Sequence, residues 1–253
     1  MDTDYIYRVR PINEFTLDEL RNSYLWFSRP EAFKGDVEDA NIAAFVENTP
    51  AIKNGFLSIC HKFPFEEWYE KLGHTGICCF TQEYPTSQDI SHFPKCKEGK
   101  GVCIAYNKNG VEQFLREHSI PRITRGFNKV VYDEDPTRIE TCDEWSILWE
   151  KFEDFKYYRT IKEIFLSSHE RDRDEFLYKL FTRINSRFSY QKEERLILGG
   201  VFIPSHDADI KGYKIPIPIN LIEKILVYPK VPRKWGDELN KIGSIKNKII
   251  NYQ

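Results

Sequence analysis

Two short apolar runs, each set between turn-forming residues, constrain the fold most strongly. Ile77-Cys78-Cys79-Phe80 and Val102-Cys103-Ile104-Ala105-Tyr106 contain no charged residue, and continuous apolar runs of this length are typical of strands covered on both faces. They predict two strands at the centre of one sheet. A chain of 253 residues, 41% of them hydrophobic, can bury such a sheet in a single domain that spans residues 1–253.

The rest of the chain alternates between strand and helix patterns. Short β-rich runs predict further strands at 5–10, 24–28, 187–198, 213–219 and 224–228. Helices are predicted to begin at a capping box, Thr16-Leu17-Asp18-Glu19, and to cover 36–48, 65–72, about 143–185 and 232–248. The helical pattern at about 143–185 fits one long helix or a helix pair. We therefore expect an α+β fold with a central mixed or antiparallel sheet.

Charge and cysteine usage narrow the cellular setting. The 37 basic and 39 acidic side chains almost cancel, so no overall field attracts nucleic acid or anionic lipid. Asp2 and Asp4 stand where a signal peptide would be apolar, and no stretch approaches the roughly 18 apolar residues of a membrane span. The six cysteines lack the spacing of a disulfide scaffold. We expect a cytoplasmic protein with reduced thiols and no membrane contact.

Motifs for metals and phosphate loops are missing from the sequence. Cysteine and histidine cluster between Cys60 and Cys103, but no CxxC or HxxxH spacing occurs, and the adjacent Cys78 and Cys79 would point to opposite faces of a strand. Neither GxGxxG nor GxxxxGK[ST] is present. We expect no metal site, and any nucleotide must be held in another way.

Two polar segments could instead carry function. In an extended chain Gln191, Glu193 and Arg195 share one face. They fit a solvated edge strand with ion pairs, or a site in which a carboxylate stabilises a developing positive charge. Arg8 is equally open, because it fits a surface arginine or a bidentate phosphate ligand.

Taken in order, several motifs resemble a large bacterial family of uncharacterised domains. That family begins with a Tyr-Lys-Tyr-Arg-like strand and ends in a Trp-x-Tyr-Glu-x-Glu-x-Arg motif. The counterparts here are Tyr5-Ile6-Tyr7-Arg8, Trp26-Phe27-Ser28-Arg29-Pro30 followed by Phe33-Lys34-Gly35-Asp36, Cys79-Phe80-Thr81, 101–106 and 188–195. Phe188 replaces the tryptophan, Gln191 replaces the first glutamate, and Lys34-Gly35-Asp36 replaces an Asn-Asp-Pro turn.

A more distant resemblance is to ADP-ribosyltransferases of the Arg-Ser-Glu type. Its counterparts are Arg8, Ser28 and Gln191-x-Glu193. The resemblance implies a split sheet and NAD as the substrate. Glu193 would be the catalytic carboxylate that stabilises an oxocarbenium-like ribose, Gln191 would orient the acceptor, and Arg8 would hold the pyrophosphate or a ribose.

The same resemblance implies further roles and partners. Ser28 would brace the strand that supports the nicotinamide, and Tyr24 or Phe33 would stack on the ring. The acceptor would be a macromolecule, RNA/DNA or protein, and an antitoxin or immunity partner would restrain a toxin-like or anti-phage effector. A basic rim for a nucleic-acid acceptor could comprise Arg29, Lys34, Lys95, Lys97 and Lys100.

Two alternatives stay open from sequence. One is a non-catalytic ligand- or partner-binding domain of the same architecture, in which the charges of residues 191–195 form structural ion pairs against Arg8. The other is a nuclease or another nucleotide-processing enzyme that uses carboxylates and a metal. Whether Arg8 and Glu193 face one cleft would discriminate the transferase from these.

Overall fold

The computed structural model describes residues 4–35, 39, 75–93, 96–118, 126–134, 181–198 and 211–251. Its helices are α1 (Glu14–Arg21), α4 (Lys108–Glu117) and α7 (Arg233–Asn240). The strands are β1 (Tyr5–Pro11), β2 (Tyr24–Ser28), β3 (Gly76–Thr81), β4 (Gly101–Asn107), β5 (Asn128–Lys129), β6 (Val131–Asp133), β7 (Arg183–Asn185), β8 (Glu193–Leu198), β9 (Gly212–Pro216), β10 (Ile222–Val227) and β11 (Ile249–Asn251).

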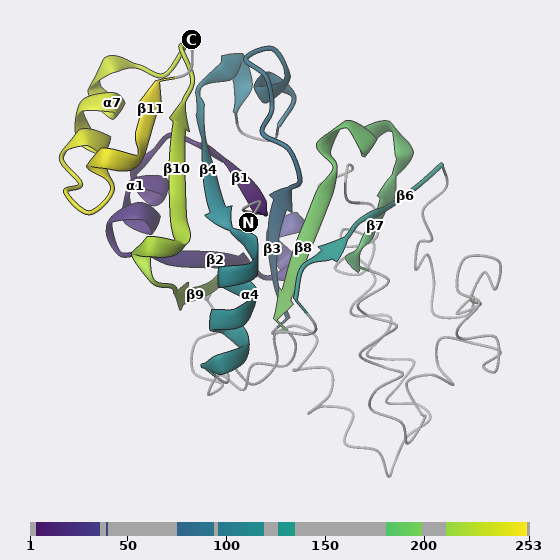
Figure 1. Ribbon diagram of the computed structural model, residues 1–253. Coiled ribbons are helices and arrows are strands. Elements are labelled where there is room, and N and C mark those ends of the chain that lie inside the picture. Colours follow the sequence, from purple (N-terminus) through teal and green to yellow (C-terminus); the bar gives the residue numbers. More distant parts are fainter. Residues whose placement is uncertain are drawn as a thin grey trace, which may run out of the picture.

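Within these ranges, nine strands form one sheet in the order β11-β10-β4-β1-β3-β2-β9, with β8 paired to β3 and β5 paired to β8 (Figure 1). All of its pairs are antiparallel except β10 with β11. Strands β6 and β7 form a separate parallel pair. The predicted combination of helices with a large, mostly antiparallel sheet is confirmed.

The two apolar runs lie inside the sheet, as predicted. Strand β4 pairs on one side with β1, where Arg8 faces Ile104, and on the other with β10, where Leu226 faces Cys103. Strand β3 pairs along its whole length with β8. The side chains of β4 are apolar on both faces because a core cluster covers each face, with Ile104 in one cluster and Cys103 in the other.

The edge of β3 that faces away from β8 pairs with two strands, one at each end, and these two strands diverge. β1 meets it at Tyr7↔Thr81 and β2 meets it at Ser28↔Ile77. The middle of this edge, residues 78–80, is therefore left between two diverging strands. In Figure 1, β2 and β9 run across the direction of β4 and β10, which agrees with a sheet that changes direction at β3.

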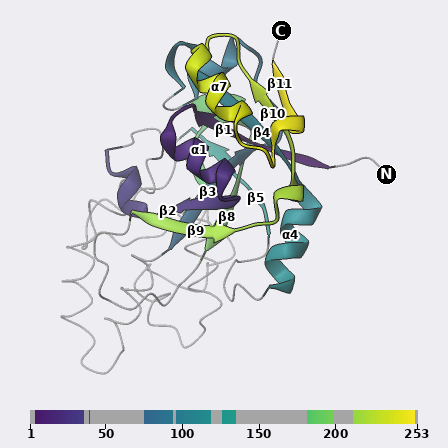
Figure 2. The same cartoon turned by 90° about the vertical axis from the view of Figure 1, so that its left-hand side faces the viewer.

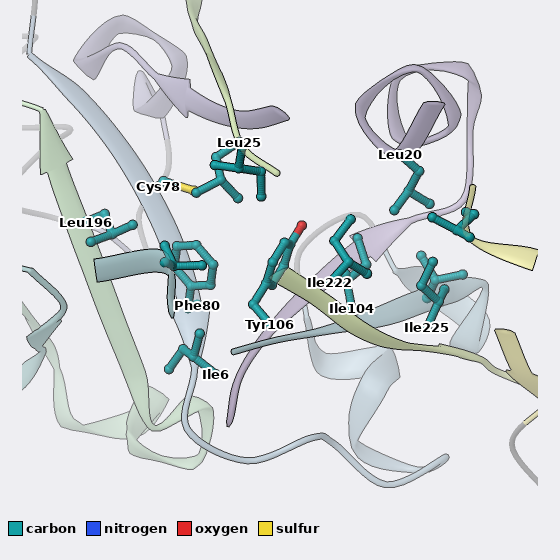
Figure 3. Close-up of a cluster of buried hydrophobic side chains, with 14 of the residues drawn as sticks. Ile6, Leu20, Leu25, Cys78, Phe80, Ile104, Tyr106, Leu196, Ile222 and Ile225 are labelled. Atoms are coloured by element: carbon teal, nitrogen blue, oxygen red, sulfur yellow. The ribbon is translucent and has the colours of Figure 1, made fainter. Parts of the chain in front are cut away.

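The main core lies on one face of the sheet, under the helices. Leu20 of α1, Ile104 of β4 and Ile225 of β10 are fully buried there, together with Tyr106 and Phe80 (Figure 3). A view turned by 90° shows α1 and α7 near each other and α4 at the far end of the sheet (Figure 2). A smaller cluster, Ile90, Cys96, Cys103 and Tyr228, covers the other face.

Several predicted boundaries are wrong. Helix α1 begins two residues before the proposed capping box, because Asn13 is its N-cap and accepts from the Thr16 backbone N–H at 3.0 Å. Residues 186–191 form a 3₁₀ segment instead of the start of a strand. Strand β7 occupies 183–185, where the long helix was predicted to end. The last helix stops at Asn240 instead of about Lys248.

Helix α4 was not predicted. It follows β4 directly, and Asn107 caps it by accepting from the Gly110 backbone N–H at 2.8 Å. Val111 and Leu115, spaced four residues apart, face the core. Gly110 lowers helix propensity at the start of this segment, which hides the apolar spacing.

The predicted helices at 36–48 and 65–72, and most of the one at about 143–185, lie outside the described residues. None of the helices in the described ranges has both the length and the apolar character needed to cross a bilayer.

Candidate functional site

A cavity of about 240 Å³ lies beside the middle of β3, where β1 and β2 diverge. Its walls come from the end of β1, from β3 and from β8. The 3₁₀ segments Pro30–Phe33 and Ser186–Gln191 complete it. Its polar and aromatic lining includes Arg8, Arg10, Ser28, Phe33, Asp39, Cys79, Phe93, Phe188, Gln191, Glu193 and Arg195.

Most of the residues that the resemblance identifies meet in this cavity. Arg8, Ser28, Phe33, Gln191 and Glu193 all line it. Arg8 and Glu193 both line the cavity, but the strand register places them on opposite faces of the sheet, because Tyr7, and not Arg8, aligns with Thr81 and through it with Glu193. The condition set from sequence, one shared cleft, is therefore met only in that both residues border the same cavity. Gln191 reaches the cavity from a 3₁₀ segment and not from a strand.

Tyr24 lies elsewhere and is not among the lining residues. Its hydroxyl donates to Asp18 Oδ2 at 2.7 Å on α1. Lys214 Nζ lies 4.7 Å from the centre of the Tyr24 ring. Phe33 is therefore the aromatic candidate of the two that borders the cavity.

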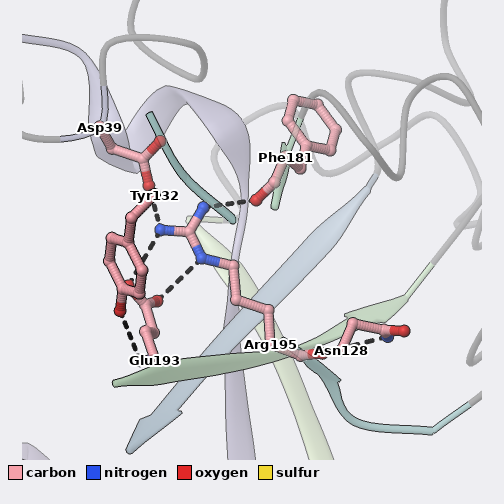
Figure 4. A network of polar contacts seen from close by, with 6 residues as sticks. All are labelled: Asp39, Asn128, Tyr132, Phe181, Glu193 and Arg195. Atoms are coloured by element: carbon pink, nitrogen blue, oxygen red, sulfur yellow. Dashed lines mark hydrogen bonds and ion pairs between the residues drawn. The ribbon is translucent and has the colours of Figure 1, made fainter. Parts of the chain in front are cut away.

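Glu193 is held in place by Arg195, two residues further along the same face of β8 (Figure 4). Arg195 Nε donates to Glu193 Oε1 at 2.8 Å, and Arg195 Nη2 lies 3.2 Å from Glu193 Oε2. The guanidinium also donates to Asp39 and to the Phe181 carbonyl. Burial alone disfavours this cation, but the charges of Asp39 and Glu193 outweigh it and raise the pKa of Arg195 well above its usual value.

Neighbouring groups complete the surroundings of Glu193. Its backbone N–H donates to the Tyr132 hydroxyl at 2.6 Å, and burial raises the pKa of Tyr132 to about 12. Burial, and then the charge of Glu193, raise the pKa of the Cys79 thiol well above its usual value. Cys79 is thus a neutral thiol at neutral pH and lacks the activation of a nucleophile.

A second ion-pair cluster borders the cavity from β1 and α1. Arg8 donates from Nη1 to Glu19 and from Nη2 to the Trp26 carbonyl at 2.9 Å. Arg10 Nε lies 3.1 Å from Glu19 Oε2, close enough for ionic attraction but without the alignment of a hydrogen bond. Burial opposes the Arg8 charge, but Cys78 and Glu19 raise the Arg8 pKa above its usual value.

The two clusters give the cavity opposite charges at its two sides. Arg8 and Arg10 share the single carboxylate of Glu19, which leaves a net positive charge beside β1. Among the described residues, two carboxylates, Glu193 and Asp39, share the one guanidinium of Arg195 beside β8. Strand β3 separates β1 from β8 in the sheet. The cavity is therefore electrostatically polar.

Sequence reasoning missed Glu19 and Asp39. The capping-box interpretation assigned Glu19 to a helix end, whereas its side chain is buried on the face of α1 that carries Leu17 and Leu20. A carboxylate beside two leucines on an apolar helix face was a usable signal, because buried carboxylates require a cationic partner. Asp39 gave no such signal, since its partner Arg195 is far along the chain.

Comparison of the chain with protein family models, curated proteins and solved structures gives no match. In the part of the chain that the structure describes, no three side chains of His, Cys, Asp or Glu gather closely enough to hold a metal ion.

Proposed function

We propose that this protein is an NAD-dependent mono-ADP-ribosyltransferase that modifies a macromolecule. In this reaction the bond between the nicotinamide nitrogen and ribose C1′ breaks, and the bonding electrons leave with neutral nicotinamide. A nucleophile of the acceptor attacks C1′ and releases its proton. The ribose passes through an oxocarbenium-like state, which a fixed negative charge close to it stabilises.

The observation that carries the proposal is that Ser28 and Glu193 share one face of the sheet and line a cavity that Arg8 also borders. They come from β1, β2 and β8 and are the three residues on which the resemblance rests. At about 240 Å³, the cavity is below the roughly 300–1,000 Å³ that encloses a drug-sized ligand. It suits the nicotinamide ribose end of NAD better than the whole dinucleotide.

The charge distribution of the cavity supports the same ligand. NAD carries an anionic pyrophosphate and a cationic nicotinamide ring, and the positive charge moves onto the ribose as the bond breaks. The Arg8 and Arg10 side suits the pyrophosphate, and the Glu193 side suits the cation. A polar cavity of this kind stabilises the separated charges without reorganising at the moment of reaction.

Glu193 can act although it is already paired. A carboxylate has about four lone-pair sites, and Arg195 uses one on each oxygen. The remaining sites can accept a ribose hydroxyl proton while Arg195 fixes the orientation of the carboxylate. Gln191, whose Nε2 donates to the Tyr190 hydroxyl at 3.3 Å, would face the acceptor.

The experiment compares Glu193→Gln with Glu194→Gln, using NAD labelled in the adenosine half and a cell extract as the source of acceptors. Glu194 is the next residue on β8, is also buried and pairs with Lys108 outside the cavity, so it controls for loss of a buried carboxylate. Nicotinamide release and label transfer should fall by about 100-fold or more in Glu193→Gln, the effect of removing one transition-state contact. Equal activity of both variants, or no turnover by the wild type, would refute the proposal.

A second candidate, a non-catalytic binding domain, is favoured by one observation. Glu193 and Arg8 each belong to a buried ion-pair cluster, and such clusters also occur in purely structural roles. Binding of NAD by the wild type without any nicotinamide release would support this candidate over the transferase.

The resemblance extends the proposal to a toxin-like or anti-phage effector with RNA/DNA or protein as its acceptor, restrained by an antitoxin or immunity partner. The proposed basic rim contributes little to this choice. Arg29 pairs with Glu31 at 3.2 Å, and Lys100 pairs with Glu98 at 2.5 Å. Lys34 is exposed. The positions of Lys95 and of the Lys97 side chain lie outside the described residues.

A further inference from the structure

The two arginines of β1 differ in what their guanidinium groups can still bind. Arg8 and Arg10 lie two residues apart, so they share one face of the strand. The Arg8 side chain is 5% exposed and the Arg10 side chain is 23% exposed. Both border the cavity. Arg10 is therefore the more accessible cation beside it.

Arg8 already uses both terminal nitrogens. One donates to Glu19 on α1 and the other to the Trp26 carbonyl on β2. These contacts join β1 to β2 and to α1 beside the middle of the β3 edge that faces away from β8. If Arg8 turned toward a ligand, it would leave a buried carboxylate and a buried carbonyl unsatisfied, each at the cost of its desolvation.

Arg10 has its guanidinium available. Its Nε faces Glu19 Oε2 at 3.1 Å, and among the described residues no hydrogen bond is made by its two terminal nitrogens. Those nitrogens form the planar fork that meets two phosphate oxygens at once. Glu19 orients the Arg10 guanidinium through its Nε. Because Glu19 also pairs with Arg8, its single negative charge neutralises only one of the two arginines.

We infer that Arg10, and not Arg8, is the residue that binds the phosphate groups of the ligand, with Glu19 as the positioning residue that aims it. The ligand class is a diphosphate-bearing molecule that reaches Arg10 at the cavity where β1 leaves β3. This inference rests on the proposed function in identifying the ligand as NAD, but the anion site itself does not require turnover.

Calorimetric titration of Arg10→Gln with three probes tests the inference. ADP-ribose and inorganic pyrophosphate carry the diphosphate, and nicotinamide riboside lacks it. Loss of a charge-assisted contact should weaken ADP-ribose and pyrophosphate binding by about 10–100-fold and leave nicotinamide riboside unchanged. If only pyrophosphate binding falls, the site takes free diphosphate and the dinucleotide assignment is overturned.

Two further variants serve as controls. Arg116→Gln removes an exposed arginine of α4 that does not line the cavity, and its affinities should equal those of the wild type. Arg10→Lys keeps the charge without the fork and should recover part of the lost affinity. Urea unfolding of each variant shows whether it is folded.

The outcomes separate this inference from the proposed function. If ADP-ribose binding depends on Arg10 but no ADP-ribose is transferred from NAD, the result supports the anion site and refutes the transferase activity. If transfer depends on Glu193 but is unaffected in Arg10→Gln, the result supports the transferase activity and overturns the anion site. Equal weakening of all three probes, or no ADP-ribose binding by the wild type, also overturns the inference.

Discussion

Replacing Glu19 by glutamine tests the ion-pair cluster that borders the cavity. The Glu19 side chain is 1% exposed. Within the described part of the chain, it is the only carboxylate that pairs with Arg8 and Arg10. Glutamine keeps the shape and one acceptor oxygen but leaves the buried Arg8 charge uncompensated. Breaking a buried pair on one side costs about 3–5 kcal/mol, and the retained acceptor puts our expectation at about 3 kcal/mol. That is a large part of the roughly 5–15 kcal/mol that stabilises a folded protein.

Urea unfolding followed by tryptophan fluorescence measures this loss. With a slope of roughly 2–3 kcal/mol per M, the midpoint should fall by about 1–1.5 M while the slope stays constant. Glu14→Gln is the matched control, because Glu14 is exposed in the first turn of the same helix. It should lose at most about 1 kcal/mol, from its interaction with the helix dipole. Equal midpoints for the two variants would show that Glu19 does not hold the arginines.

The remaining predictions concern a surface carboxylate and two glycines. Hydrogen bonds from Lys214 and then Tyr24 lower the pKa of Asp18, so its contribution is complete above the ordinary Asp value and is lost as pH falls through the lowered one. Asp18→Asn should therefore cost up to about 1 kcal/mol at pH 7, and a cost that persists at pH 2 would contradict this cause. A Cβ on Gly212 would lie 2.3 Å from the Phe27 carbonyl oxygen, so Gly212→Ala should lower the unfolding free energy by about 1–3 kcal/mol. Gly236→Ala, in an open position of α7, should raise it by about 0.5–1 kcal/mol, and equal thermal midpoints of the two variants would refute both expectations.

Strands were predictable where the local pattern is decisive. β2 has the predicted bounds, and β1, β3 and β4 differ from the predicted runs by one or two residues, because short apolar or aromatic runs between turn formers have few other ways to be buried. Residues 187–191 were predicted as strand but belong to the 3₁₀ segment Ser186–Gln191. There Lys192 adopts a left-handed conformation with φ 43°. Nothing local requires such a conformation of a lysine.

The candidate site was predictable to the extent that its residues belong to recognisable motifs. Arg8, Ser28 and Glu193 could be named from their order, and the structure brings them to one cavity. Tyr24 was named on aromatic character alone, and its hydrogen bond to Asp18 turns it elsewhere. Aromatic residues are common in cores and on sheets, so residue type by itself could not distinguish it from Phe33.

The sequence by itself determined which side chains share a face. Alternation along a strand puts Arg8 with Arg10, and Glu193 with Arg195, whatever the remainder of the chain does. Only the tertiary structure decided how these charges are paired. Glu19 reaches the arginines from α1, and Asp39 reaches Arg195 across 156 positions of sequence. The balance of positive and negative charge around the cavity depends on those long-range contacts, because a buried charge is compensated by whatever the fold brings beside it and not by its neighbours in sequence.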